Sequence, residues 1–378
     1  MRTARRLKHR ARNAVVSAPL AFVALWLGLQ WVLDERPQLR DPSYHGKVTF
    51  LADRLDKAGP EPLTIVALGS SRTACYFNPT AFESEFAAVT GRSCIAHNIA
   101  RPANGPVGQS LQLRRLLNRG IRPDVVIVEL TPCMTGELKG IYAEYVAIHP
   151  TTVTRKEVEF LTELGYADDG FRELWNKEHL NPYHSFRFQL IGQIQPKWSP
   201  PGVVRYTRKP SRPTGWEPII AKMQQGDYEK NLAAAKEGFY ERVQGDDIAP
   251  QARAAFNCIF ETCRKQGIVA VAVFSPESTE FRDWYTAGSH ERVIAMRALA
   301  YEGTGGNVFN TVDWLPNHYF SDGHHVMPDG ADVYSARLAR EVLVPTLRRT
   351  LLSSLEPPIA HSPMLPGAAA VLSDSHRR

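Results

Sequence analysis

Two short polar blocks, far apart in the sequence, contain the residue types that serine nucleophile chemistry needs. The first, Gly69-Ser70-Ser71-Arg72-Thr73, directly follows an apolar run. The second, Asp322-Gly323-His324-His325, lies just before a proline that can start a helix. A serine hydroxyl is a weak nucleophile until a base removes its proton. An aspartate three residues before a histidine can orient that histidine as the base. We therefore expect Ser71, Asp322 and His325 to converge as a catalytic triad.

Each block also has a simpler interpretation. Ser70 and Ser71 could cap the following helix or bind an anion at its N-terminus. Asp322, His324 and His325 could together hold a metal ion, although the sequence offers no further cluster of ligand residues. Serine chemistry requires both blocks at once, and the pair therefore favours it more than either block does alone.

Alternating apolar runs and helical segments predict a parallel sheet that positions these blocks. We expect buried strands at 63–68, 93–99, 125–130 and 268–274, with a shorter fifth at 308–312. We expect helices at 79–89, 108–119, 251–266 and 331–352. Continuous β-branched runs are typical of strands covered on both faces. In such sheets ligands bind beyond the carboxyl ends of the strands. The sequence therefore predicts an α/β fold with the Ser71 block at that edge.

The two blocks resemble those of the SGNH (GDSL-type) hydrolase superfamily. Its members carry a Gly-Asp-Ser block after the first strand and an Asp-x-x-His block before the last helix. Gly69-Ser70-Ser71 resembles the former, and Asp322 to His325 resembles the latter. The Gly-Ser-Ser-Arg form is similar to membrane-tethered branches that take part in acylation of bacterial envelope polymers, such as the alginate O-acetylation and teichoic-acid D-alanylation families. The resemblance covers roughly residues 60 to 135 and 250 to 350 and implies a three-layer, flavodoxin-like parallel sheet.

The middle of the chain departs from this pattern. Members of the superfamily usually have a Gly after the second strand and an Asn after the third, and both help to bind the oxyanion. Here Ala100 stands where the Gly is common, and Thr131-Pro132 follows the third strand. The resemblance implies that the Ala100 backbone or Asn104 supplies this function. Loss of one oxyanion donor costs about 10²–10³ in rate. Arg72 and His324 are expected to contact substrate, with an ion pair as the alternative for Arg72.

The N-terminus predicts a membrane anchor. Six basic residues and no acid precede residue 14, and the run Ala14 to Leu33 carries no charge and only Ser17 and Gln30 as clearly polar residues. About 20 apolar residues span a bilayer, and basic flanks stay on the cytoplasmic side. We expect a single pass through the bacterial cytoplasmic membrane, with the remaining chain outside the cytoplasm. A cleaved signal peptide is the alternative, although no A-x-A site follows the run.

The remaining chain divides into segments of different character. Residues 1–13 form the expected basic cytoplasmic tail, 14–33 the anchor, and 34–58 a stalk with a short helix. Residues 59–352 form the expected catalytic domain, with a helical insertion at about 135–250, and 353–378 a disordered tail rich in Pro, Ala and Ser. The five cysteines show no metal-site spacing and are expected to be mostly buried apolar residues.

The expected function is acyl-ester chemistry on a cell-envelope substrate. Without the six N-terminal charges, basic and acidic residues are equal in number, which argues against nucleic-acid binding. We expect O-acyl transfer or ester hydrolysis through Ser71, without a cofactor, and with an envelope glycan or other acylated substrate. A membrane acyl-donor protein is a candidate partner. The alternatives are a non-catalytic SGNH-like binding or assembly module and a metal-dependent hydrolase.

Overall fold

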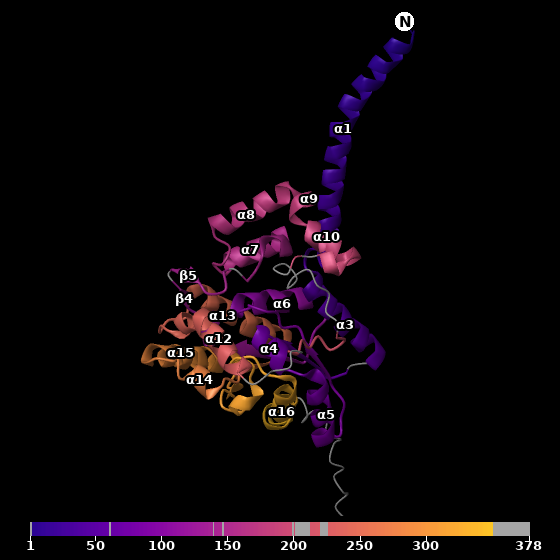
Figure 1. The fold of residues 1–378 in the computed structure, drawn as a ribbon. Coiled ribbons are helices and arrows are strands. Elements are labelled where there is room, and N and C mark those ends of the chain that lie inside the picture. Colours follow the sequence, from indigo (N-terminus) through magenta and orange to yellow (C-terminus); the bar gives the residue numbers. More distant parts are fainter. Residues whose placement is uncertain are drawn as a thin grey trace, which may run out of the picture.

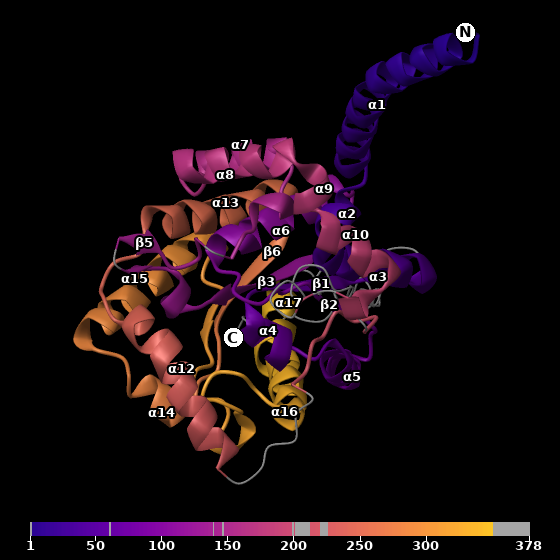
Figure 2. The same cartoon turned by 45° about the horizontal axis from the view of Figure 1, so that its top comes forward.

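The centre of this computed structural model is a five-stranded parallel sheet (Figure 2). The structure describes residues 2–59, 62–138, 140–145, 147–198, 200, 212–219 and 226–350. The strand order is β2-β1-β3-β6-β7. The bounds are β1 Thr64–Leu68, β2 Ile95–Asn98, β3 Val125–Leu130, β6 Val269–Phe274 and β7 Val308–Asn310. The α/β class predicted from the apolar runs is therefore confirmed. In this doubly wound order the chain adds β2 on one side of β1 and the later strands on the other side, and such sheets bind ligands at this switch point between β1 and β3.

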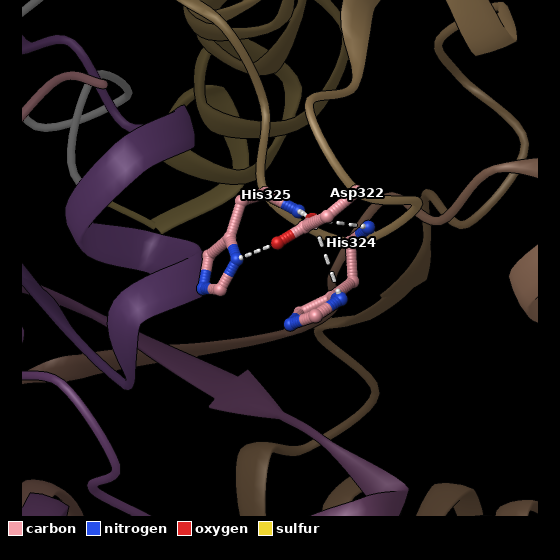
Figure 3. A group of neighbouring side chains, drawn as sticks. All are labelled: Asp322, His324 and His325. Carbon is pink, nitrogen blue, oxygen red and sulfur yellow. Dashed lines mark hydrogen bonds and ion pairs between the residues drawn. The ribbon is translucent and has the colours of Figure 1, made fainter. Parts of the chain in front are cut away.

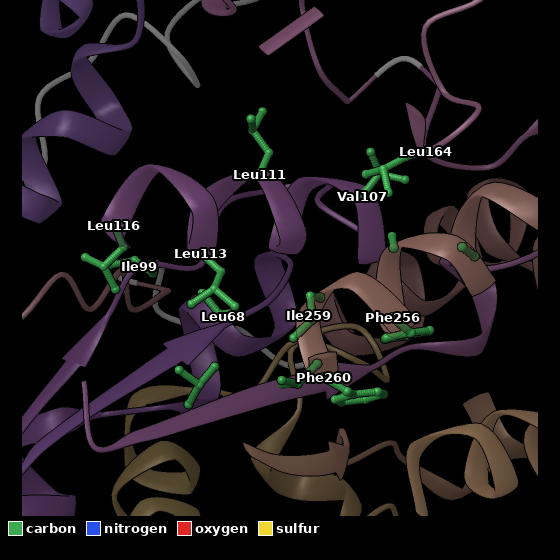
Figure 4. Packing of buried hydrophobic residues seen from close by; sticks show 14 of the residues in the cluster. Leu68, Ile99, Val107, Leu111, Leu113, Leu116, Leu164, Phe256, Ile259 and Phe260 are labelled. Carbon is green, nitrogen blue, oxygen red and sulfur yellow. The ribbon is translucent and has the colours of Figure 1, made fainter. Parts of the chain in front are cut away.

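Two helical layers cover the sheet because successive strand residues face opposite sides. Val66 and Leu68 pack in one core cluster, and Ile65 and Ala67 pack in the other. The first layer consists of α3 Pro42–Ala58, α6 Pro106–Asn118, α13 Pro250–Gln266 and α15 Ala287–Thr304. Figure 4 shows residues of α6 and α13 packed over the strands. The second consists of α5 Pro79–Thr90, α16 Pro328–Leu338 and α17 Val344–Thr350.

The expected insertion lies between β3 and α13 and is mostly helical. It contains a small antiparallel hairpin and five helices that the structure describes. Their bounds are β4 Glu137–Leu138, β5 Ile141–Tyr142, α7 Arg155–Glu163, α8 Asp169–Leu180, α9 Pro182–Ser185, α10 Arg187–Ile194 and α12 Asp227–Val243. The short α14, Thr279–Arg282, follows β6. Single 3₁₀ turns occur at Pro132–Met134, Pro150–Thr152, Pro196–Trp198 and Asn317–Tyr319.

The C-terminal helix begins earlier than its apolar pattern suggests. Pro328 occupies its first position, where a missing N–H costs nothing, so α16 starts three residues before the expected boundary. A π-turn at Ala339–Leu343 joins α16 to α17. The predicted tail at 353–378 lies outside the described residues.

The N-terminal helix α1, Arg2–Glu35, projects from the domain (Figure 1). Its part Asn13–Glu35 is long and apolar enough to cross a membrane, with a mean hydropathy of 1.8. Pro19 lies inside the helix, which bends along its length in both views (Figures 1 and 2).

The segment expected as a stalk is instead part of the folded domain. It forms α2, Pro37–Arg40, and the seventeen-residue α3. Tyr44, Val48 and Leu51 of α3 are completely buried in the first core cluster. These residues recur at the spacing of one helical face, and the face packs on the domain instead of meeting water.

Candidate active site

The structure brings Ser71, Asp322 and His325 together at the carboxyl edge of the sheet. Ser71 is the first residue of α4, Ser71–Tyr76, which follows β1. Asp322 and His325 lie in the loop between β7 and α16. The Nε2 atom of His325 is 2.7 Å from Ser71 Oγ, and its Nδ1 atom is 2.7 Å from Asp322 Oδ2. Figure 3 shows the imidazole of His325 facing the Asp322 carboxylate.

The hydrogen bonds fix the tautomer of His325. A carboxylate can only accept a hydrogen bond, and Asp322 stays ionised. Burial acts to raise the pKa of Asp322, but its hydrogen bond to His325 and the nearby imidazoles hold that pKa well below its usual range. Nδ1 of His325 therefore carries the proton, and Nε2 is left to accept the proton of the Ser71 hydroxyl. This is the arrangement that general-base activation of a serine requires.

The loop that carries Asp322 and His325 is held by its own backbone. Asp322 Oδ1 accepts the backbone N–H of His325 at 2.8 Å and that of His324 at 3.2 Å. The Ser321 N–H donates to the His325 carbonyl at 2.9 Å and closes the loop. Gly323 has a φ of +89°, a backbone region that residues with a Cβ rarely adopt. The short Asp-x-x-His spacing thus makes one rigid turn that presents both side chains.

A sharp turn before α4 presents Ser71. Ser70 is the N-cap, and its Oγ accepts the N–H of Arg72 at 3.1 Å. A Cβ on Gly69 would lie 2.1 Å from Thr73 Oγ1, so only glycine fits the turn. The N–H at the first position of a helix has no acceptor within that helix. The Ser71 N–H therefore has no acceptor within α4.

A buried acid that the sequence analysis did not assign to the site holds this turn. Glu129, near the end of β3, is 1% exposed. Its carboxylate accepts the Ser70 N–H at 2.5 Å, the Ser70 hydroxyl at 2.8 Å and the Thr73 hydroxyl at 2.5 Å, and it also accepts the Thr131 hydroxyl. A single acid in the apolar run VVIVEL is the signal that could have identified it, because a buried charge needs partners.

A cavity of about 330 Å³ adjoins Ser71. Its apolar lining includes Ala103, Met134, Ala143, Ala147 and Phe239. Arg242 and His324 also line the cavity, and no acidic residue of the described chain does so. A small acyl group with an apolar body fits this lining.

His324 lies in the cavity wall as an uncharged side chain. It is 2% exposed, and its ring centroid is 4.5 Å from that of Phe239 and 5.2 Å from that of Phe281. Burial lowers the pKa of His324 well below its usual value. Neither ring nitrogen has a hydrogen-bond partner in the described structure. Nδ1 lies 3.4 Å from Asp322 Oδ1. The expected contact of His324 with substrate stays a prediction.

Arg72 lines the cavity and is also held in an ion pair. Its Nη1 atom is 2.5 Å from Glu277 Oε1, and its guanidinium lies 4.8 Å from the centre of the Phe281 ring. Burial acts to lower the pKa of Arg72, but the charge of Glu277 helps to raise it above its usual value. The ion pair that was the alternative for Arg72 is therefore present and limits the freedom of Arg72 to bind an anion, and the expected contact with substrate stays a prediction.

Neither residue expected to bind the oxyanion is among those that line the cavity beside Ser71. The Ala100 N–H already donates to Asn98 Oδ1 at 3.1 Å, and Ala100 is fully buried. Asn104 packs against the start of α6, where a Cβ on Gly108 would lie 2.6 Å from its Cγ. The cavity is lined by Ala103 instead, which has a φ of +65° and is the one non-glycine residue with positive φ in the described chain.

The same loop contains a group that could bind a metal ion. The ligand atoms of Asp322, His324 and His325 lie within 4.8 Å of one another. A carboxylate and two imidazoles suit Zn²⁺. A metal at His325 would have to replace its hydrogen bond to either Asp322 or Ser71. Metal binding and a serine triad are therefore mutually exclusive uses of His325.

No model of a protein family matches this chain, and a search of curated proteins finds no match to it. The function of the site is therefore inferred from its geometry.

Proposed function

We propose that this protein is a membrane-anchored SGNH-type serine enzyme that transfers or hydrolyses an acyl ester. The observation that carries the proposal is the bridging position of His325, with one ring nitrogen 2.7 Å from Ser71 Oγ and the other 2.7 Å from Asp322. Capping of α4 does not require this bridge, because the Ser70 side chain already caps that helix.

The reaction proceeds through an acyl-enzyme. Ser71 Oγ attacks the ester carbonyl while its proton moves to His325 Nε2. The C–O bond to the alcohol breaks, and the alcohol leaves with the proton from His325. A second hydroxyl, from water or from a sugar, then gives its proton to His325 and attacks the acyl carbon. The bond between the acyl carbon and Ser71 Oγ breaks, and His325 returns the proton to Ser71. The Ser71 N–H is the proposed donor to the oxyanion, and Asp322 stabilises the charged imidazole in each step.

The proposed substrate is an acylated component of the bacterial cell envelope. The N-terminal charges favour a cytoplasmic start of α1, and this supports a domain on the outer side of the cytoplasmic membrane. An envelope glycan is then the accessible acyl acceptor, and a membrane protein that exports acyl groups is the proposed partner. The apolar cavity beside Ser71 favours a small acyl group.

An activity probe tests the assignment of the nucleophile. The purified full chain in detergent is treated with a fluorophosphonate, which labels activated serines. Wild type and Ser84→Ala, which alters an exposed serine on α5, are expected to be labelled. Ser71→Ala is expected to lose the label. Labelling that persists in Ser71→Ala, or labelling of wild type that a metal chelator abolishes, would contradict the serine mechanism.

A non-catalytic binding module is the second candidate. The engaged Ala100 N–H and the absence of an Asn after β3 support it. This function predicts that wild type is not labelled, does not hydrolyse simple acetyl esters and shows an unchanged cellular phenotype after Ser71→Ala. Any Ser71-dependent turnover excludes it.

The topology has a separate test. Alkaline phosphatase, fused to the C-terminus, is active only outside the cytoplasm, whereas a green fluorescent protein fused there folds in the cytoplasm. The proposed orientation predicts phosphatase activity without fluorescence. The opposite result would place the domain in the cytoplasm and exclude an envelope substrate.

A further inference from the structure

The end of α8 and the short helix α9 lie against the membrane-spanning part of α1 (Figures 1 and 2). Trp26 Nε1 donates to the Leu180 carbonyl at 3.1 Å, and Gln30 Nε2 donates to the His179 carbonyl. The rings of Phe22 and Tyr183 are 5.8 Å apart. The three α1 residues all fall within the span Asn13–Glu35.

These contacts place the α8–α9 junction at the depth of the bilayer. A helix rises 1.5 Å per residue, so Trp26 lies about 13 Å from Glu35 along α1. The hydrocarbon core of a bilayer is about 30 Å thick. If α1 spans the membrane up to Glu35, a chain segment beside Trp26 lies within the outer half of that core.

The hydrogen bonds at this junction suit an apolar medium. The last carbonyls of a helix lack partners within it, and an unpaired carbonyl in hydrocarbon costs several kcal/mol. Here α1 supplies donors to two carbonyls at the end of α8, those of His179 and Leu180. This explains why Gln30, one of the two clearly polar residues between Ala14 and Leu33, occurs in the anchor.

Two apolar side chains at the junction, those of Leu180 and Tyr183, are exposed beside the exposed polar residues Lys177, Asn181 and His184. Leu180 is 71% exposed and Tyr183 is 40% exposed. Outside α1, five of the eleven exposed large hydrophobic residues of the described chain lie between residues 174 and 198. The contact of the junction with α1 favours lipid as what covers Leu180 and Tyr183, because segments that touch at the same depth share the same medium.

We propose that the α8–α9 junction, from Leu180 to Tyr183, enters the outer leaflet of the membrane that α1 spans, while the exposed Lys177 and His184 beside it reach the headgroups. The inference rests on the proposed anchor. Arg40, which is 1% exposed, reinforces the attachment: it pairs with Asp34 at the end of α1, and its Nη1 atom is 2.6 Å from His179 Nε2. The domain is then held at the bilayer surface in one orientation, without the mobility of a tether.

Depth-dependent quenching tests this proposal on the full chain in lipid nanodiscs. Cys258 is only partly buried and is replaced by Ser, whereas the other four cysteines are buried. An environment-sensitive fluorophore is attached to Leu180→Cys. Ile294→Cys on α15, 61% exposed, is the matched control, and Leu20→Cys reports on α1. We expect nitroxide-labelled lipid to quench the Leu180 and Leu20 labels, and aqueous iodide to quench only the Ile294 label.

The outcomes separate this inference from the anchor itself. Quenching of the Leu20 label by lipid, with the Leu180 label quenched by iodide alone, overturns the immersion of the junction and leaves the anchor in place. The exposed junction would then be a surface for a protein partner. A Leu20 label that responds only to iodide overturns the anchor and the immersion together.

Discussion

At the scale of single residues, the site depends on an imidazole that keeps one tautomer. Asp322 enforces this tautomer because its ionised carboxylate accepts a hydrogen bond from the Nδ1–H group of His325. An amide at position 322 can donate as well as accept, so it no longer imposes that tautomer. We expect Asp322→Asn to lower kcat by about 10⁴, measured as turnover of a simple acetyl ester. Asp313→Asn, an exposed aspartate in the loop after β7, is the control. A loss below tenfold would mean that His325 is oriented in another way.

A second residue-scale prediction concerns Glu129, whose carboxylate accepts hydrogen bonds from Ser70, Thr73 and Thr131. In Glu129→Gln, the amide nitrogen faces donors and leaves at least one buried group unpaired, at a cost of about 1–3 kcal/mol. We expect a lower midpoint of thermal unfolding and a lower kcat, because the same bonds hold the serine turn. Glu163→Gln, an exposed acid at the end of α7, is expected to change neither. A stable Glu129→Gln protein with full activity would show that the turn is held without this carboxylate.

At the scale of elements, contact between helices decides which glycines are required. Gly303 on α15 has no room for a Cβ, which would lie 2.2 Å from the Phe260 ring of α13. Gly238 on α12 has no atom within 4 Å of an added Cβ. We expect Gly303→Ala to destabilise the fold by about 1–3 kcal/mol through overpacking. We expect Gly238→Ala to stabilise it by about 0.5–1 kcal/mol through helix propensity. Denaturant unfolding of the two variants measures the difference, and equal effects would show that α13 and α15 are not packed this closely.

The elements that the sequence predicts well are those whose signal is local. The strands are continuous β-branched runs, and the glycines at 91 and 267 end predicted helices in the left-handed conformation. The spacing of Tyr44, Val48 and Leu51 also carried a helical signal, but the surface on which α3 packs comes from distant parts of the chain, β2 and α6 among them. A stalk was therefore the wrong expectation for residues 34–58.

The sequence likewise predicts some parts of the candidate site and not others. Ser71 and the pair Asp322 and His325 each follow an element boundary that the sequence marks, so their convergence could be expected from sheet topology. The oxyanion assignment depends on which backbone N–H groups are already engaged. Ala100 donates to the side chain of Asn98, a contact that no spacing rule predicts.

At the scale of the whole molecule, buried histidines make stability depend on pH. His97 is completely buried, and its Nε2–H donates to the Lys47 carbonyl at 2.8 Å. Burial lowers the pKa of His97 to about 3 and that of His45 to about 4. In the unfolded chain a histidine has a pKa of about 6.5. Below that pH the unfolded chain binds protons that the folded protein does not, so these histidines reduce stability as the pH falls from about 6.5 toward the folded pKa values.

Buried Glu144 opposes this trend, and a variant is needed to isolate the histidine contribution. Burial raises the pKa of Glu144 to about 7, so this group favours the folded state as the pH falls. Each histidine that stays neutral in the folded protein lowers the free energy of unfolding by about 1.4 kcal/mol when the pH falls from 7.5 to 5.5. The amide of His97→Gln can still donate to the Lys47 carbonyl but does not titrate. We therefore expect the free energy of unfolding of this variant to fall by about 1.4 kcal/mol less than that of wild type between pH 7.5 and 5.5. Denaturant unfolding at the two pH values measures the change, with exposed His290→Gln as the control. If His97→Gln and wild type lose the same stability, His97 is protonated within the folded protein, and its burial does not keep it neutral.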